Sequence, residues 1–206
     1  LTSDDIDDPN FSFAITGNGI QPDMTVSGNA VTINNNDITP SIADFSDFGD
    51  ARTDGQTVTR TFLIENNGDA DLNISLPFSI SVAASADCSV NAQPAATVAP
   101  GGNTSFQVTF DPSTTGNRDA TIGFSSDDID DPNFSFAISG NGIQPDMTVS
   151  GNAVTINNND ITPSTADFSD FGDARTDGQT FIRTFSIDNN GDADLNISLP
   201  VSISGA

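Results

Sequence analysis

The 206-residue sequence contains no histidine, lysine, tryptophan or tyrosine, and it has a single cysteine. Without histidine or lysine, the common nucleophile and general-base arrangements cannot be assembled, so we expect a protein that is not an enzyme. A pair of loop aspartates, the remaining route to sugar hydrolysis, is a poor candidate in a repeated loop. Cys88 excludes an internal disulfide and a two-cysteine zinc or redox motif. We expect it to be a small buried apolar residue; the alternative is a disulfide between two molecules.

Positive charge is also scarce, because five arginines face 29 acidic residues and the formal net charge is −24. Nucleic acid and anionic membranes require clustered Lys or Arg, so we expect neither as a partner. No apolar run approaches the roughly 20 residues of a membrane span, and no signal peptide opens the chain. We therefore expect no membrane insertion by this stretch of the polypeptide.

The residues that are abundant favour strands and tight turns. Glu65 is the only glutamate, so nearly all the negative charge is on aspartate, which prefers turns and calcium loops to helices and strands. Thr, Ser, Val, Ile, Asn and Gly dominate the remainder, Phe is the only aromatic residue, and long stretches of helical period are absent. The composition therefore predicts an all-β protein.

A long internal repeat gives the domain organisation. Residues 3–83 match residues 126–206 at a constant offset of 123, with eight differences. The eight differing pairs are Thr16/Ser139, Ile42/Thr165, Val58/Phe181, Thr59/Ile182, Leu63/Ser186, Glu65/Asp188, Phe78/Val201 and Val82/Gly205. This period exceeds solenoid units of roughly 20 to 50 residues and fits an immunoglobulin-sized domain. We predict tandem immunoglobulin-like β-sandwich domains within a longer polypeptide: residues 1–19 as the last strand of a preceding repeat, 20–142 as a complete repeat and 143–206 as the first part of the next.

Short runs of alternating apolar and polar residues, separated by turn clusters, predict the strands of the complete repeat. The expected strands are Met24–Ile33, Gln56–Glu65, Asp71–Val82, Cys88–Val98, Thr104–Phe110, Arg118–Ser125 and Phe134–Ser139. Alternation predicts these inward side chains: Val58, Phe62, Ile64, Phe106, Val108, Phe110, Ala120, Ile122, Phe124, Phe134, Phe136 and Ile138. Two of the differing pairs, Thr59/Ile182 and Leu63/Ser186, alternate with these inward positions. They are therefore expected on the solvent-exposed face, where substitutions are tolerated.

Several short motifs carry a family resemblance. They are Phe48-Gly49, Thr59-Arg60-Thr61-Phe62, Asn66-Asn67-Gly68, Phe110-Asp111-Pro112, and Phe136-Ala137-Ile138 before Gly140-Asn141-Gly142. Together they resemble the choice-of-anchor D repeat, a bacterial relative of the immunoglobulin-like ASPM-SPD-2-Hydin domains, over essentially the whole chain. The resemblance implies a secreted bacterial protein of many such modules, held at the cell surface by a terminal anchor that varies between members. It gives no activity by itself.

The aspartate-rich loops predict a calcium site, since carboxylate, amide and carbonyl oxygens are the ligands that this cation prefers. The main cluster is Asp127, Asp128, Asp130 and Asp131. In an immunoglobulin-type sandwich this loop lies at the same pole as residues 66–71, so we expect Asp69 and Asp71 to approach it, with the linker residue Asp23, across a domain junction. Calcium there would stiffen a string of domains. The alternative is that these aspartates only solubilise the loops and prevent edge association.

The arginines give weaker signals. Arg60 and its twin Arg183 fall on the inward parity, and we expect each to be a strand-end arginine paired with a nearby aspartate, because an unpaired buried cation is costly. The alternative is a contact with a ligand. We expect Arg52 and Arg118 to be ordinary surface charges.

Three classes of function remain. The leading hypothesis is a structural module of a surface stalk or extracellular filament, whose partners are neighbouring repeats and copies of itself in a fibre. The second is an adhesion module that binds a protein or carbohydrate through several domains at once; the absence of Trp and Tyr weakens the carbohydrate version, and an exposed edge strand would favour a protein partner. The third is an accessory domain of an enzyme whose catalytic part lies elsewhere.

Overall fold

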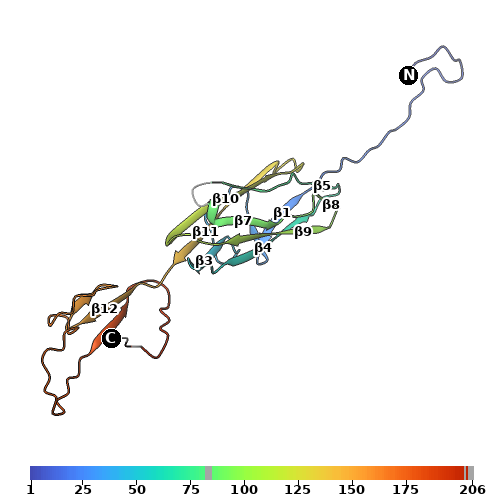
Figure 1. Cartoon of the computed structure of the whole chain (residues 1–206). Coiled ribbons are helices and arrows are strands. Elements are labelled where there is room, and N and C mark those ends of the chain that lie inside the picture. The colour runs from blue at the N-terminus through green and yellow to red at the C-terminus, as the bar shows by residue number, and fades with distance from the viewer. Residues whose placement is uncertain (82–84, 202, 204–206) are drawn as a thin grey trace.

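The computed structural model describes residues 1–81, 85–201 and 203, and within them the chain is all-β apart from one 3-10 turn, η1 (Ser85–Asp87). Eleven strands lie between residues 24 and 143 (Figure 1). They are β1 (Met24–Gly28), β2 (Val31–Ile33), β3 (Asp47–Arg52), β4 (Val58–Asn66), β5 (Leu72–Asn73), β6 (Ser79–Ser81), β7 (Cys88–Ala92), β8 (Thr97–Val98), β9 (Asn103–Phe110), β10 (Gly116–Ser125) and β11 (Asn133–Ile143). Within the described ranges, no helix is long and apolar enough to cross a membrane.

These strands form a sandwich. One sheet has the order β2-β1-β4-β9-β7 and the other β3-β11-β10-β6, while β5 and β8 pair separately. All the pairs are antiparallel except β3 with β11, which is parallel. The parallel pair places the end of β3 beside the end of β11, since Arg52 is the register partner of Ile143.

Phenylalanine is the most frequent residue in the core between the sheets, with eight of its twenty buried residues. Phe62 of β4 stacks on Phe106 of β9, with ring centroids 5.2 Å apart, and tilts against Phe136 of the facing sheet at 5.3 Å. Each fully buried side chain of this size contributes about 1.5–3 kcal/mol, and each such aromatic pair about 0.5–1.5 kcal/mol more. The predicted inward positions are confirmed: all are buried except Val58, which packs against the core while partly exposed.

The strand boundaries differ from the prediction in several places. Met24–Ile33 is a hairpin of β1 and β2 rather than one strand, because Asn29 and Ala30 have positive φ values of 50° and 60°. The pair Gly28-Asn29 does signal a turn, but Ala30 at the second turn position does not, so the alternation alone predicts one continuous strand. The Asp71–Val82 run divides into β5 and β6, and its Val82 lies outside the described residues. The Cys88–Val98 run likewise divides into β7 and β8.

A second set of strands follows after the three residues 144–146. It comprises β12 (Met147–Gly151), β13 (Val154–Ile156) and β14 (Phe185–Asn189), in the order β13-β12-β14. The register repeats that of the first copy, with Met147 opposite Asn189 as Met24 is opposite Asn66. Residues 1–19 extend away from the sandwich (Figure 1). The domain boundaries at 19/20 and 142/143 remain predictions, and β11 runs through the second without a break.

Candidate functional site

The aspartate loop between β10 and β11 anchors the beginning of β1. Asp128 is only 3% exposed; one carboxylate oxygen accepts the N–H of Met24 at 2.7 Å, and the other accepts the N–H of Asp130 at 3.0 Å. Both donors belong to the main chain, and charge-assisted bonds of this kind are about twice as strong as neutral ones. Asp128 therefore holds the entry of the chain into the sandwich.

Asp127 and Asp131 fasten the same loop to other segments. The two carboxylate oxygens of Asp127 accept the N–H and the side-chain amide of Asn73, each at 2.8 Å. Burial raises the pKa of Asp127, but the hydrogen bonds from Asn73 outweigh it and leave the pKa below its ordinary value. Asp131 accepts the side-chain amide of Asn35 at 2.8 Å. Three aspartates of the predicted cluster thus act as hydrogen-bond acceptors for neighbouring segments.

The second predicted loop lies at the same pole. Asn73, which follows the loop of residues 66–71, bonds to Asp127, and Asp69 donates its N–H to the Gln21 carbonyl at 3.0 Å. The side chains of Asp69, Asp71 and Asp130 are exposed. Across the described residues, no three His, Cys, Asp or Glu side chains are grouped to hold a metal ion. Calcium binding by Asp127, Asp128, Asp130, Asp131, Asp69 and Asp71 therefore stays a prediction.

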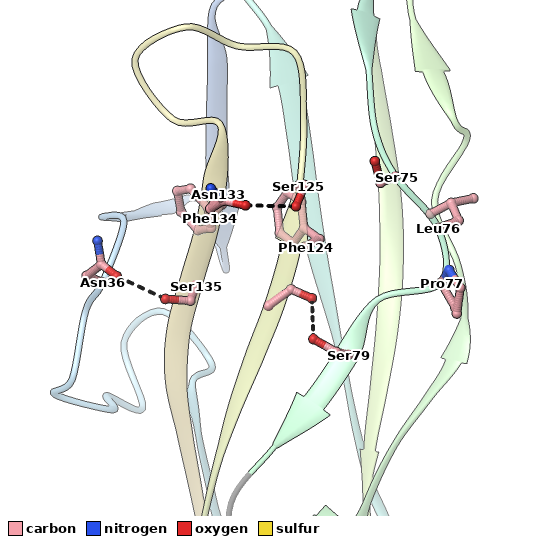
Figure 2. A pocket seen from close by; sticks show the side chains of 11 residues that line it. Asn36, Ser75, Leu76, Pro77, Ser79, Phe124, Ser125, Asn133, Phe134 and Ser135 are labelled. Carbon is pink, nitrogen blue, oxygen red and sulfur yellow. Dashed lines mark hydrogen bonds between the residues drawn. The ribbon is translucent and has the colours of Figure 1, made fainter.

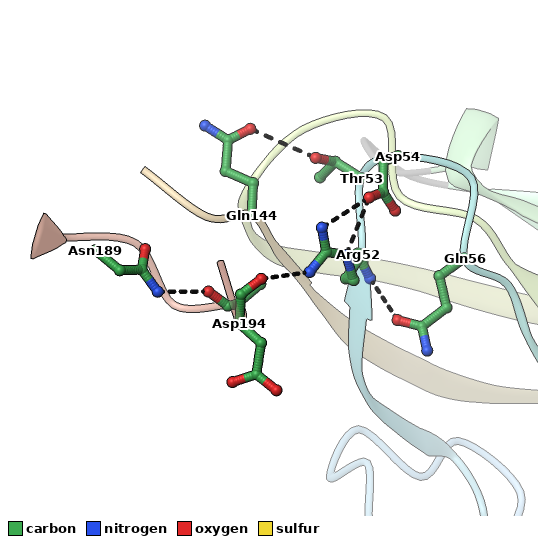
Figure 3. Close-up of polar contacts among 8 residues, drawn as sticks. Arg52, Thr53, Asp54, Gln56, Gln144, Asn189 and Asp194 are labelled. Atoms are coloured by element: carbon green, nitrogen blue, oxygen red, sulfur yellow. Dashed lines mark hydrogen bonds and ion pairs between the residues drawn. The ribbon is translucent and has the colours of Figure 1, made fainter. Parts of the chain in front are cut away.

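At the opposite pole, Arg52 reaches from the end of β3 to the second copy (Figure 3). Its Nε and Nη2 donate to one oxygen of Asp54 at 3.0 and 2.9 Å, and its Nη1 donates to the main-chain carbonyl of Asp194 at 2.8 Å. The hydrogen bond to Asp54 raises the pKa of Arg52, burial opposes this, and the charges of Asp54 and Asp194 raise it further. Arg52 is thus a bridging residue, and the expectation of an ordinary surface charge is wrong.

The linker of residues 144–146 is bonded on both sides. Thr53 donates its N–H to the Ile143 carbonyl at 3.0 Å and its hydroxyl to the Gln144 side chain at 3.4 Å (Figure 3). On the other side, the Gln144 carbonyl accepts the N–H groups of Asp192 and Ala193 at 3.1 and 3.3 Å. Gln21 accepts the twin pair of N–H groups in the first copy, so this way of docking the linker recurs.

Glycine is required where the linker meets this turn. A Cβ added to Gly191 would lie 2.2 Å from the Gln144 carbonyl oxygen, and one added to Gly68 would lie 2.3 Å from the Gln21 carbonyl oxygen. No side chain fits at such a distance. The Asn-Asn-Gly motif therefore serves to seat the linker closely.

Arg118 forms a partly buried ion pair with Asp87 of η1. Its Nε and Nη2 both lie 2.6 Å from one oxygen of Asp87, whose other oxygen accepts the N–H of Ser113 at 3.0 Å. The Asp87 side chain is only 3% exposed. Burial raises the pKa of Asp87, but the hydrogen bonds from Ser113 and Arg118 outweigh it and lower the pKa overall. Arg118 is therefore a structural residue rather than the predicted surface charge.

Arg60 stacks on an aromatic ring instead of pairing with an aspartate. Its guanidinium carbon lies 4.5 Å from the ring centroid of Phe45, and Arg183 lies 4.5 Å from Phe168 in the second copy. In the described part of the chain neither arginine forms an ion pair, so the predicted aspartate partner is wrong. Phe45 has a φ of 66°, unfavourable for a bulky residue, and cation–π contact offsets part of that cost.

A hollow of about 420 Å³ lies on the surface beside β6, β10 and β11 (Figure 2). Its polar side chains bond within the rim: Ser79 donates to the Gly123 carbonyl at 2.9 Å, and Ser135 donates to Asn36 at 3.1 Å. Among the described residues, none that lines it is charged, and Leu76 is 41% exposed there. Its chemistry suits an apolar or uncharged contact more than catalysis.

The two facing sheets, with a parallel strand at one edge, define an immunoglobulin-like β-sandwich. Residues 40–141 match the family model described as the HYDIN/CFA65/VesB-like Ig-like domain. The match supports an Ig-like domain related to HYDIN over these residues, which is the coarser part of the sequence resemblance.

Several solved structures are similar to parts of this chain. A Porphyromonas gingivalis W83 protein of unknown function has 18% identity and a TM-score of 0.42, with 58% of this chain and 46% of that chain covered. The secreted serine protease VesC of Vibrio cholerae has 14% identity and a TM-score of 0.39, covering 48% of this chain and 22% of VesC. The ASH/PapD-like domain of human CEP192 has 14% identity and a TM-score of 0.36, with 67% of this chain and 100% of that chain covered. The chain thus spans less than half the length of the first two. No curated protein matches the chain.

Proposed function

We propose that this chain is a structural repeat module of a secreted bacterial surface stalk, adhesin or extracellular filament. The observation that carries the proposal is the linker of residues 144–146, which leads directly from β11 into β12 and is hydrogen-bonded on both sides. A linker held in this way gives consecutive sandwiches a set spacing. A spacer needs this property, whereas domains joined by free linkers move independently.

The near-identity of the two copies supports the same proposal. A specialised binding site needs only one copy, whereas a spacer gains length from many interchangeable ones. The surface charge also suits this role, because a chain with 29 acidic residues and five arginines resists non-specific association with its neighbours. The proposal assigns the module no catalytic role, since it has no histidine or lysine to supply one.

The proposal includes a particular family of repeats. The Phe48-Gly49, Asn66-Asn67-Gly68 and Phe110-Asp111-Pro112 motifs support membership of the choice-of-anchor D repeats, and an extracellular location follows from that membership. The partners are then neighbouring repeats of the same chain and copies of the chain in a fibre. Calcium at the aspartate pole would be an additional stiffening ion.

A protein-binding adhesion module is the second candidate. It is favoured by the hollow beside β6, where the short edge strand and exposed Leu76 offer a place for an added strand of a partner (Figure 2). Leu76→Asp would abolish such binding without changing the spacing of the domains. Loss of adhesion with unchanged particle length would support this second function.

The test of the spacer proposal is small-angle X-ray scattering of the 206-residue chain. We expect a profile that fits one elongated particle, because the linker leaves little freedom. A profile that requires an ensemble of bent shapes would overturn the proposal. The same measurement, with thermal unfolding, is repeated in excess calcium and then with chelator. A higher Tm and a straighter particle support the calcium prediction; no change leaves the aspartates as hydrogen-bond acceptors.

A further inference from the structure

The same arginine occurs in both copies and has a different neighbour in each. The main-chain N–H of Arg52 donates to Gln56 at 3.0 Å, and that of Arg175 donates to Gln179 at 2.9 Å, so the local turn is the same. The Arg52 side chain is 26% exposed and that of Arg175 is 79% exposed. Arg52 lies in β3, which pairs with β11, and meets the turn that contains Asp194, whereas Arg175 lies outside the strands.

We infer that Arg52 locks each repeat onto the next, and that the surface it fits is the Asn-Asn-Gly-Asp-Ala-Asp turn, residues 189–194, of the following copy. The inference rests on the proposed tandem arrangement and names the contact that fixes it. Asp194 accepts through its main-chain carbonyl. The partner is thus recognised by the shape of the turn together with the acidic side chains beside it.

Each copy carries both halves of this contact. The first copy has the arginine at the end of β3 and the identical turn, residues 66–71, at the opposite pole, where Met24 is paired with Asn66. A donor at one pole and an acceptor at the other make a head-to-tail interface, which propagates along a chain of any length. One arginine in each repeat therefore provides one lock at each junction.

The guanidinium is oriented before the neighbour contacts it. The distance from Nη2 to the aspartate oxygen is 2.9 Å for Arg52–Asp54 and 3.0 Å for Arg175–Asp177, although only Arg52 contacts a following turn. The pair therefore forms without the neighbour, and docking adds a bond from Nη1 without having to order the side chain. Preorganisation of this kind lowers the entropic cost of association.

The receiving turn is also held in shape. Asn189 donates its side-chain amide to the Ala193 carbonyl at 2.8 Å, which orders the residues before Asp194 (Figure 3). Asn66 makes the same bond to Ala70 at 2.8 Å in the first copy. The turn thus offers the same acceptor geometry in every repeat, and the positive charge of Arg52 approaches a strongly acidic partner favourably.

The test compares Arg52→Gln with the matched control Arg175→Gln in the 206-residue chain. Residual dipolar couplings are measured for the amides of β1–β11 and of β12–β14. In the unsubstituted chain and in Arg175→Gln, we expect both sets to fit one alignment tensor. In Arg52→Gln, we expect a smaller tensor for β12–β14 and about two- to fivefold faster hydrogen exchange at Asp192 and Ala193. Arg52→Lys keeps the charge but loses the planar guanidinium group. Its couplings and exchange rates should therefore fall between those of the unsubstituted chain and those of Arg52→Gln.

The outcomes separate the lock from the proposed function. Couplings and exchange in Arg52→Gln equal to those of the unsubstituted chain would overturn the lock while leaving the spacer proposal standing. Two independent tensors in the unsubstituted chain would overturn the spacer proposal itself. Unchanged amide shifts in β9 and β10 confirm that each variant keeps the first sandwich folded.

Discussion

The two copies of the repeat have nearly the same sequence and the same strand register, yet their apolar side chains differ in burial. Phe62 and Ile64 of β4 are 0% exposed, whereas their twins Phe185 and Ile187 of β14 are 40% and 43% exposed. In the first copy, the ring of Phe62 packs against Phe106 of β9 and Phe136 of β11. Strand register therefore forms between residues close in sequence, whereas burial of Phe62 requires β9 and β11, which are distant from β4 in sequence.

The largest expected difference between the copies is at this phenylalanine. Phe62→Ala should lower the free energy of unfolding of the first sandwich by about 3–5 kcal/mol, because it leaves a cavity against Phe106 and Phe136. Phe185→Ala should lower it by no more than about 0.5 kcal/mol, since that side chain lies outside the first core. Urea unfolding followed by circular dichroism measures both values. Similar losses in the two variants would show that the copies are not separate in stability.

The ion pair of Arg118 and Asp87 gives a second difference between the copies, because it joins η1 and β10 of the first copy. Arg118→Leu leaves the carboxylate of Asp87 buried without its cation and should destabilise the first sandwich by about 3 kcal/mol. The control is Arg175→Leu, which removes an exposed ion pair from the second copy and should have little effect. Chemical denaturation at neutral pH gives both values, and equal effects would contradict the structural role of Asp87.

The same pair predicts a pH dependence. The folded-state pKa of Asp87 lies below its ordinary value of 3.8, so the stability it contributes is present above that value and is lost as the pH falls through the folded pKa. Thermal unfolding between neutral pH and pH 2 should show a decline that Asp87→Asn reduces. An identical decline in this variant would mean that other carboxylates cause it.

A smaller effect is expected from exchanging residues between the copies on the outer face of β4. Leu63→Ser and Thr59→Ile place second-copy residues in the first copy, where Thr59 is exposed and Leu63 is partly exposed. The combined change should alter the free energy of unfolding by about 1 kcal/mol or less. Val58→Phe should destabilise the first sandwich more than this combined change, because Val58 packs against the core and a partly buried position tolerates added volume less well. Denaturation curves that rank the variants in the reverse order would contradict the assigned faces.

The sequence predicted the parts of the fold that depend on local alternation. The sequence predicts which side chains of β9, β10 and β11 face the core, because apolar residues occur there at every second position. Strand β3 could not, since Asp47-Phe48-Gly49-Asp50 has the composition of a turn and becomes a strand only by pairing with β11. Tertiary pairing overrides local propensity at such a place.

The candidate site was predictable in its location more than in its chemistry. The predicted neighbours of the aspartate loop were Asp23, Asp69 and Asp71, and in the structure the loop bonds to the nearby residues Met24 and Asn73. Composition does not distinguish a carboxylate that binds a cation from one that accepts main-chain N–H groups, which is how Asp128 is used. Arg52 gave no signal, because its partner carbonyl belongs to the next copy and lies far away in sequence.

The smallest expected effect concerns Cys88, which is partly buried against the first core. Burial raises the pKa of this thiol to about 11, the charge of Asp87 raises it as well, and Arg118 lowers it. Because only the thiolate reacts, a thiol reagent at pH 8 should modify the folded chain much more slowly than the urea-unfolded chain. Non-reducing electrophoresis should likewise show no disulfide-linked dimer. Equal labelling rates in the folded and unfolded chains would show that Cys88 is accessible, and the alternative of a disulfide between two molecules would then be favoured.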